Sequence, residues 1–384
     1  MSLADRMWFL FWICVFGATY SYFVYPVILV AFSRWRPVVP LAAASETNPI
    51  VSVIITVHNE AHRIEQKLGN TLALDYPRDR LEIVVASDAS NDGTDDIVRR
   101  FASQAVRLVR AEERKGKEYA QALAVKAARG EILVFSDVAT QIPTDAIGRL
   151  VRRFDDPRIG AISSEDRFIS PTGQVVGEGA YVRYEMWLRR LESSVHSLVG
   201  LSGSFFAARR SVCQDWNISV PSDFNTALNA VRAGYVAVSA PEVIGVYQDI
   251  ADSRKEYQRK VRTVIRGIAA VAARVEVLNP FKFGFFSFQV FSHKIMRWLV
   301  PWFLVVLFIV SAVLAQHHWI YRTALLVQIA FYGLAAIGLF VPAMRAVAVV
   351  KFPFFFAQVN AAVLHATVSF MTGRRVTVWT PSKR

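Results

Sequence analysis

The sequence has little cysteine: Cys14 and Cys213 are the two cysteines among 384 residues. Cys14 lies in an apolar stretch and Cys213 in the polar middle of the chain, which argues against a disulfide framework and excludes a cysteine-based metal site. This cysteine usage fits a reducing compartment for the middle of the chain.

Further absences narrow the possible ligands. There is no G-x-G-x-x-G pattern and no Walker A loop, so the known glycine-rich phosphate cradles are excluded. There is no zinc-finger spacing, RNP motif or long basic run. The formal net charge of +13 therefore points to anionic lipid or an anionic substrate before nucleic acid.

Apolar residues make up 53% of the chain and concentrate at its two ends. Residues 7–33 carry no charge and exceed the roughly 20 residues that cross a bilayer. The alternative is a signal peptide, because the stretch "LAAAS" at 41–45 resembles a cleavage site. The apolar run is too long for a signal peptide, and Arg34 and Arg36 intervene, so we expect an uncleaved anchor.

The C-terminal third predicts further membrane segments. Residues 299–315 and 324–343 are clear spans, and the aromatic and basic stretch at 281–298 is typical of an interfacial helix or of the flank of the next span. The stretch at 347–371 contains polar residues and precedes a basic tail, so it is either transmembrane or re-entrant. Arg34 and Arg36 place the middle domain in the cytoplasm by the positive-inside rule.

The sequence thus predicts a multi-pass protein of the inner (plasma) membrane. Its parts are an N-terminal transmembrane anchor (1–36), a cytoplasmic domain (37–280), an interfacial helix (281–298), two transmembrane helices (299–343), and a third apolar segment with a basic tail (344–384).

The middle of the chain alternates strand-like and helix-like stretches. Strand patterns occur at 49–60, 81–90, 105–113 and 131–140, and helical sequence separates them. This alternation predicts an α/β fold, with a mostly parallel sheet covered by helices on both faces. Polar sequences, "VHNE", "SDASNDGT" and "SDVAT", end three of the strands, so they line one crevice at the carboxyl edge. Carboxylates there could bind a divalent cation, or accept hydrogen bonds from the N–H groups of a base and the hydroxyl groups of a ribose.

At these residues the chain resembles the membrane-integrated, inverting glycosyltransferases of family two, related to cellulose, chitin and hyaluronan synthases. "VSVIITVHNE" resembles the first strand of that family, and "SDASNDGT" is close to its D-x-S-x-D-G-T signature. The resemblance covers nearly the whole chain, including the order of membrane and soluble parts. It implies a GT-A-like fold, flanked by transmembrane helices, and a nucleotide-diphosphate sugar donor, usually a UDP-sugar.

The resemblance assigns roles to the strand-end residues. Asp88 would accept a hydrogen bond from the uracil edge, with support from Ser90 and from Val57, His58 and Glu60 in "TVHNE". The alternative for Asp88 and Ser90 is an Asx-type turn that caps a helix beginning near Thr94.

The resemblance also implies that two further motifs bind the diphosphate of the donor. "RKGKEYAQ" at 114–121 resembles the lysine-glycine segment of the family, and Lys115 and Lys117 would reach a phosphate, or else begin a solvated helix. "FSDVAT" stands where the family has D-x-D or D-x-N, which implies that Asp137 binds Mg²⁺ or Mn²⁺. Ala139 replaces the second acid, so the resemblance implies weak metal binding or a site that has lost activity, with Thr140 as an unproven substitute ligand.

"VPSDFNTALNAVRAGY" at 220–235 resembles the segment that carries the catalytic base, and Asp223 is the candidate. One carboxylate there would take the proton of the acceptor hydroxyl while its oxygen attacks the anomeric carbon in line. Ser222 stands where the family often has a second acid. The alternative for Asp223 is a helix N-cap.

Acceptor and channel residues complete the resemblance. Gly203 and Ser204 in "GLSGSFFAARRS" match the element beneath the acceptor sugar, and Trp187 would stack on a sugar or else face the core or the membrane. Gln258, Arg259 and Arg262 in "YQRKVRT" match part of Q-x-x-R-W and would contact the diphosphate. Thr263 replaces the tryptophan, which counts against a long polymer channel and leaves a basic amphipathic helix as the alternative.

The sequence as a whole predicts an inner-membrane glycosyltransferase that forms a β-glycosidic bond for a cell-surface or exported polysaccharide. Its expected partners are a nucleotide-sugar donor, a glycan or lipid-linked acceptor, membrane lipid and other synthesis or export subunits, without nucleic acid. One alternative is transfer of a single sugar to a lipid or polyprenyl-linked acceptor. The other is a catalytically silent membrane subunit, suggested by Ala139 and Ser222.

Overall fold

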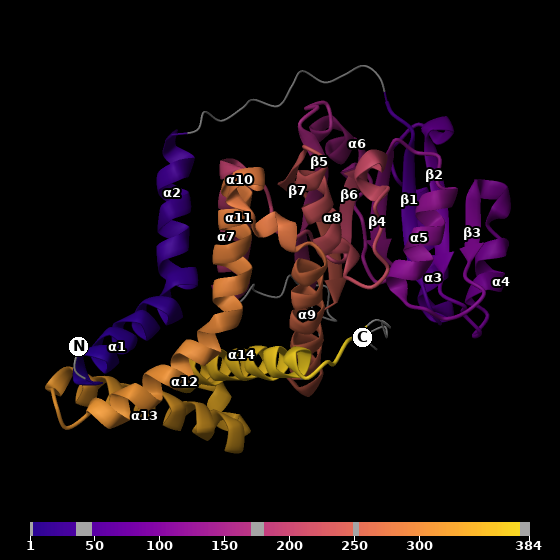
Figure 1. Cartoon of the computed structure of the whole chain (residues 1–384). Coiled ribbons are helices and arrows are strands. Elements are labelled where there is room, and N and C mark those ends of the chain that lie inside the picture. The colour runs from indigo at the N-terminus through magenta and orange to yellow at the C-terminus, as the bar shows by residue number, and fades with distance from the viewer. Residues whose placement is uncertain (1–2, 36–47, 170–179, 249–252, 377–384) are drawn as a thin grey trace. The chain divides into compact units, whose positions relative to one another are not determined.

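The computed structural model describes residues 3–35, 48–169, 180–248 and 253–376 (Figure 1). The stretch at 41–45, considered above as a cleavage site, lies outside the described residues. The chain divides into two compact units. The helical unit comprises Met1–Ile28, Asp252–Ile268 and Gln289–Arg375, and the sheet unit comprises Leu29–Ala251, Ala269–Phe288 and Val376–Arg384.

The sheet unit contains a seven-stranded sheet in the described part of the chain, in the order β3-β2-β1-β4-β6-β5-β7. The strands are β1 (Val51–Val57), β2 (Leu81–Ser87), β3 (Val106–Arg110), β4 (Ile132–Asp137), β5 (Ile159–Ile169), β6 (Phe205–Arg209) and β7 (Val236–Gln248). Strands β1 to β4 run parallel, and β6 runs antiparallel to both β4 and β5. The predicted α/β fold with a mostly parallel sheet is confirmed.

Both faces of the sheet are covered, which explains why β1 is buried at every position. Alternate residues of a strand point to opposite faces. Accordingly, Val53 and Ile55 join one core with α3 (Ala61–Leu72), α4 (Thr94–Arg99) and α6 (Ala146–Arg153). Ile54 joins a second core with α5 (Lys117–Ala127) and α8 (Ser222–Arg232) on the other face.

The described part of the chain contains further α-helices. They are α1 (Leu3–Thr19), α2 (Tyr25–Trp35), α7 (Ala180–Val195), α9 (Ser253–Ala273), α10 (Pro280–Phe283), α11 (Phe285–Val290), α12 (Met296–Leu314), α13 (Trp319–Phe340) and α14 (Ala348–Met371). Single π-helical turns join α1 to α2 at Tyr20–Val24 and α11 to α12 at Phe291–Ile295.

Four helical stretches among the described residues are long and apolar enough to cross a membrane: Arg6–Trp35, Phe285–Leu314, Trp319–Phe340 and Ala348–Met371. The first, third and fourth coincide closely with the predicted apolar segments. The second runs without a break through the expected boundary at residue 298, so residues 285–298 of the predicted interfacial stretch form one continuous helix with the next span. Segment 347–371 is likewise one helix, without the turn that a re-entrant segment requires.

Candidate active site

Two loops at the carboxyl edge of the sheet are bound to each other by backbone-to-side-chain hydrogen bonds. The N–H of Asn59 donates to Ser90 Oγ (3.2 Å), and the N–H of Glu60 donates to Thr94 Oγ1 (2.9 Å). The N–H of Asn91 donates back to Asn59 Oδ1 (2.9 Å). The loops after β1 and β2 therefore form one rigid surface, as the adjacency of parallel strand ends predicts.

Both loops contain a residue with a left-handed backbone that is not glycine. Asn59 has a φ of 54° and Ala89 a φ of 52°. For alanine this conformation costs free energy, and such strain persists where the surrounding contacts enforce it. The hydrogen bonds between the loops supply that enforcement, and strain of this kind concentrates at ligand sites.

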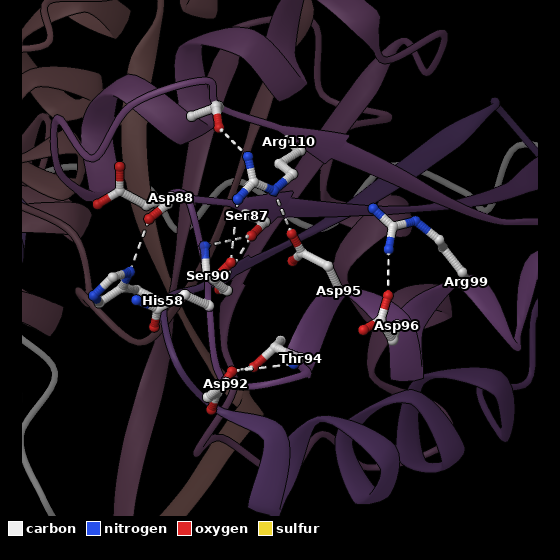
Figure 2. Close-up of polar contacts among 12 residues, drawn as sticks. His58, Ser87, Asp88, Ser90, Asp92, Thr94, Asp95, Asp96, Arg99 and Arg110 are labelled. Carbon is white, nitrogen blue, oxygen red and sulfur yellow. Dashed lines mark hydrogen bonds and ion pairs between the residues drawn. The ribbon is translucent and has the colours of Figure 1, made fainter.

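Asp88 is fully buried at the end of β2. Its carboxylate accepts hydrogen bonds from the backbone N–H groups of Lys115 (2.9 Å) and Gly116 (3.0 Å), at the start of α5. Its carbonyl accepts a hydrogen bond from His58 Nδ1 at 2.8 Å, so this ring nitrogen carries the proton (Figure 2). Asp88 thus fixes three segments of the predicted donor surface, and its contact with a base stays a prediction.

The alternative role for Asp88 and Ser90, a turn capping the next helix, belongs instead to Asp92. Asp92 Oδ1 accepts from the N–H of Thr94 at 3.1 Å and from the Thr94 hydroxyl (Figure 2). Asp92 Oδ2 accepts from the N–H of Ala61. Burial favours a higher pKa for Asp92, but these hydrogen bonds from Thr94 and Ala61 outweigh it and lower the pKa.

The predicted diphosphate, acceptor and base residues meet at the end of β4. Lys117 Nζ lies 2.6 Å from Asp137 Oδ1 and donates to the carbonyl of Gly203 at 3.0 Å. The N–H of Asp137 donates to the carbonyl of Ser204 at 2.9 Å. A Cβ added at Gly203 would lie 3.0 Å from Asp223 Oδ2, so the absence of a side chain there admits the carboxylate.

Asp223 lies in the first turn of α8 but does not cap it. Pro221 occupies the N-cap position, and Asp223 Oδ1 accepts from the N–H of Phe224 at 2.9 Å. The alternative interpretation of Asp223 as an N-cap is therefore wrong. The residue before Asp223 is the buried Ser222, where the resembled family often has a second acid.

Lys67 is a buried lysine of α3 that the sequence reasoning missed. Its side chain is fully buried, and Nζ donates to Ser136 Oγ (2.7 Å) and to the carbonyl of Thr140 (2.5 Å). Burial lowers the pKa of Lys67 to about 7, against the attraction of Asp137. The available signal was its position between Ile64, Leu68 and Thr71, on the apolar face of an amphipathic helix.

Glu60 is a second buried ionisable group at this edge. Burial raises the pKa of its carboxyl; Arg63 and His62 oppose the rise, and Asp137 adds to it. Within the described part of the chain, Glu60 Oε2 is buried without a hydrogen-bond partner. Such a group suits a ligand that brings its own donor.

The side chains of several other predicted site residues make separate contacts or belong to the other unit. The ammonium of Lys115 lies 3.2 Å from Glu113 at the surface. Trp187 is exposed on α7, with its ring 6.0 Å from that of Tyr184. Gln258, Arg259 and Arg262 lie on the part of α9 that belongs to the helical unit. The roles of all these residues stay predictions.

The donor set at Asp137 fits a metal ion that arrives with a diphosphate. The described residues contain no group of three or more His, Cys, Asp or Glu side chains that could hold a metal. Thr140 is fully buried, and its hydroxyl donates to the carbonyl of Ser204 at 3.4 Å, so its role as a substitute for the acid missing at Ala139 stays a prediction. Asp137 would supply one carboxylate ligand, and Mg²⁺ commonly binds through one or two carboxylates alongside substrate phosphates.

Comparison with known proteins agrees with this geometry. Residues 52–216 match the family Glycosyl transferase family 2. The glycosyltransferase AglE of Haloferax volcanii is 26% identical over 212 residues, which cover 53% of this chain and 68% of that protein. A poly-beta-1,6-N-acetyl-D-glucosamine synthase of Staphylococcus epidermidis is 26% identical over 43% of this chain, which spans 40% of that synthase.

Among solved structures, a mannosyltransferase of Pyrobaculum calidifontis, in complex with GDP-Man and Mn²⁺, aligns with a TM-score of 0.72 and 26% identity. The alignment covers 94% of this chain and 99% of that one. Residues 52–216 therefore match a glycosyl transferase family 2 domain; the chain has a GT-A-like fold, is a glycosyltransferase, and is similar over part of its length to a polysaccharide synthase.

Proposed function

We propose that this protein transfers a sugar from a nucleotide-diphosphate donor to a growing glycan at the membrane, with inversion at the anomeric carbon. The observation that carries the proposal is the convergence of Lys117, Asp137, Gly203 and Asp223. The Lys117 ammonium, the Asp137 carboxylate, the open backbone of Gly203 and the Asp223 carboxylate therefore lie within one small region. An inverting transfer can use a base, room for the acceptor and positive charge at the leaving group.

The proposed reaction is a single displacement. The Asp223 carboxylate takes the proton of the acceptor hydroxyl while its oxygen bonds to the anomeric carbon. The bond from that carbon to the diphosphate oxygen breaks, and its electron pair leaves with the diphosphate. Lys117 binds the departing charge, and a Mg²⁺ or Mn²⁺ ion held by Asp137 would add positive charge there. An α-linked donor gives a β-linked product.

The donor nucleotide is the least constrained part of the proposal. The sequence resemblance favours a UDP-sugar, whereas the mannosyltransferase with a similar structure holds GDP-Man. The loops after β1 and β2 supply the surface for either base. We keep UDP as the first expectation and treat GDP as the second donor class to test.

The test is nucleoside-diphosphate release by purified full-length protein across a panel of UDP- and GDP-sugars, with Mg²⁺ or Mn²⁺. Release with one sugar, reduced about 10²- to 10⁴-fold in Asp223→Asn, is expected if Asp223 is the base. Binding of the nucleoside diphosphate is expected to survive in that variant. Asp96→Asn, which alters an exposed ion pair with Arg99, is the matched control.

A panel without any turnover, from folded protein that binds no nucleoside diphosphate, would overturn the proposal and leave the silent membrane subunit. Transfer of a single sugar to a lipid is the other alternative. Four candidate spans among the described residues and Thr263 favour it, because a long glycan channel needs several helices around it. Product length separates the two: products with one added sugar would rule out polymer synthesis.

A further inference from the structure

An apolar cavity of about 310 Å³ lies within the helical unit. Its lining comes from three helices: Pro301, Leu304, Val305, Phe308 and Ile309 of α12, Tyr332 of α13, and Phe356, Ala357, Asn360, Ala361 and Leu364 of α14. These side chains carry no charge. The cavity therefore suits a hydrocarbon chain, since a polar ligand would lose its hydration there without compensation.

A cation precedes this cavity on the same face of α12. The α12 residues that line it, from Pro301 to Ile309, follow the spacing of a single helix face. Arg297 stands one turn before Pro301 and so belongs to that face. An apolar groove that begins at an arginine matches a molecule with an anionic head and an apolar chain.

Contacts of Arg297 join it to the cavity wall. Its guanidinium lies over the ring of Tyr22, 5.0 Å from the centroid, and the Tyr22 ring lies 6.2 Å from that of Phe356, which lines the cavity. Arg297 Nη1 lies 3.4 Å from His293 Nε2. A guanidinium that stacks through its face presents its N–H groups at its edge, where phosphate binds.

The position of Arg297 along its helix fits the headgroup level of a bilayer. Leu314 ends the helix, and polar sequence follows it. Arg297 lies roughly 25 Å before Leu314 at 1.5 Å per residue, and the hydrocarbon core is about 30 Å thick. With Leu314 at one boundary, the backbone of Arg297 lies within about 5 Å of the other, a gap that its long side chain spans, and the cavity lies between them.

We propose that this groove binds an anionic phospholipid, with its phosphate on Arg297 and one acyl chain along the face from Pro301 to Ile309. Free phosphate would leave the apolar wall unfilled, and a zwitterionic lipid would bring a second cation to the arginine. Charge complementarity and the continuity of cation and groove therefore select an anionic lipid. The inference is independent of the sugar chemistry, but requires the helical unit to lie in a bilayer.

The test measures the melting temperature of the full-length protein in nanodiscs of phosphatidylcholine, with and without phosphatidylglycerol. We expect phosphatidylglycerol to raise the melting temperature of the wild type, and Arg297→Gln to lose most of that rise. Arg345→Gln is the matched control, because Arg345 also stacks on an aromatic ring of this unit, Phe354, away from the cavity lining. It should keep the rise.

A second variant tests the groove itself. Ala361→Phe adds a ring at an exposed position of the lining and should reduce the effect of phosphatidylglycerol while Arg297 is intact. An equal rise in wild type and Arg297→Gln, or an equal loss in both arginine variants, would overturn the proposal. So would full stabilisation by glycerol phosphate without acyl chains, or displacement of phosphatidylglycerol by an isoprenyl phosphate at equal concentration. Wild type that stays soluble without detergent would refute the bilayer requirement.

Discussion

Gly203, a predicted acceptor residue, packs closely against Asp223, the predicted base. A methyl group at this position would stand 3.0 Å from Asp223 Oδ2, so Gly203→Ala should displace the carboxylate by a few tenths of an ångström. We expect kcat to fall roughly tenfold, because small misplacements of reacting groups are costly. Steady-state kinetics with saturating donor will measure this.

The control for Gly203 lies in α6. Gly148 has open space around a Cβ, so Gly148→Ala should leave kcat unchanged and should stabilise the helix by up to about 1 kcal/mol. An unchanged kcat in Gly203→Ala would contradict the placement of Asp223 beside the acceptor.

Lys67 gives the pH dependence of stability a specific source. The pKa of Lys67 is lowered to about 7 in the folded protein, whereas an unfolded lysine titrates near about 10.4. Between these values the unfolded chain binds more protons, so Lys67 makes stability rise with pH in that window. Below it, the full cost of burying the charged ammonium is present.

Lys67→Met removes this titration. The melting temperature of the wild type relative to Lys67→Met should therefore increase between about pH 7 and about pH 10. Melting curves of both proteins across this range will measure it, with the solvent-exposed Lys126→Met as the control. A difference independent of pH would mean that Lys67 does not change its charge in this window.

The loops after β1 and β2 act as one element through Asp92. Asp92→Ala removes the hydrogen bonds to Thr94 and Ala61, so we expect a loss of about 1 kcal/mol of stability and a higher KM for the donor. Because the pKa of Asp92 is lowered, its contribution is full above the unfolded value of about 3.9 and disappears as pH falls through the folded value.

Denaturant unfolding and donor kinetics will measure the effect of Asp92→Ala. Asp96→Ala is its control, since Asp96 pairs with Arg99 on the exposed side of α4 and should change stability by less than about 0.5 kcal/mol. Equal donor KM values in wild type and Asp92→Ala would separate this loop from donor binding.

The sequence predicted β1 to β4, because apolar runs that end in polar residues mark buried parallel strands, but it did not predict β5, β6 and β7. It could not reveal the roles that depend on contacts between distant segments. The buried position of Lys67 depends on the loop after β4, and lysine is rarely buried. The sequence left Asp88 and Ser90 open as capping residues, and only the folded loop assigns the hydrogen bonds of Thr94 to Asp92.

At the scale of the whole chain, the uninterrupted α14 favours the transmembrane form of segment 347–371 over the re-entrant form. Phe285–Leu314, Trp319–Phe340 and Ala348–Met371 would cross the membrane in turn, which puts the C-terminus on the side opposite the sheet unit. A reporter fused after Arg384 should therefore be active outside the cytoplasm if the sheet unit is cytoplasmic. A second fusion at the exposed Ala346, before α14, should report the cytoplasm. A cytoplasmic signal from both fusions would restore the re-entrant form of this segment.

The dipeptide Gly203–Ser204 contacts both the residues proposed for the diphosphate and the proposed base. Its carbonyl groups receive Lys117 and the N–H of Asp137, while its open Cα faces Asp223. A sugar that moves this dipeptide on entering would shift the diphosphate residues and the base in the same step. Occupancy of the two substrate sites is then energetically linked, and the linkage is reciprocal. The apparent affinity for the nucleotide-sugar should depend on acceptor concentration, as in an ordered ternary complex.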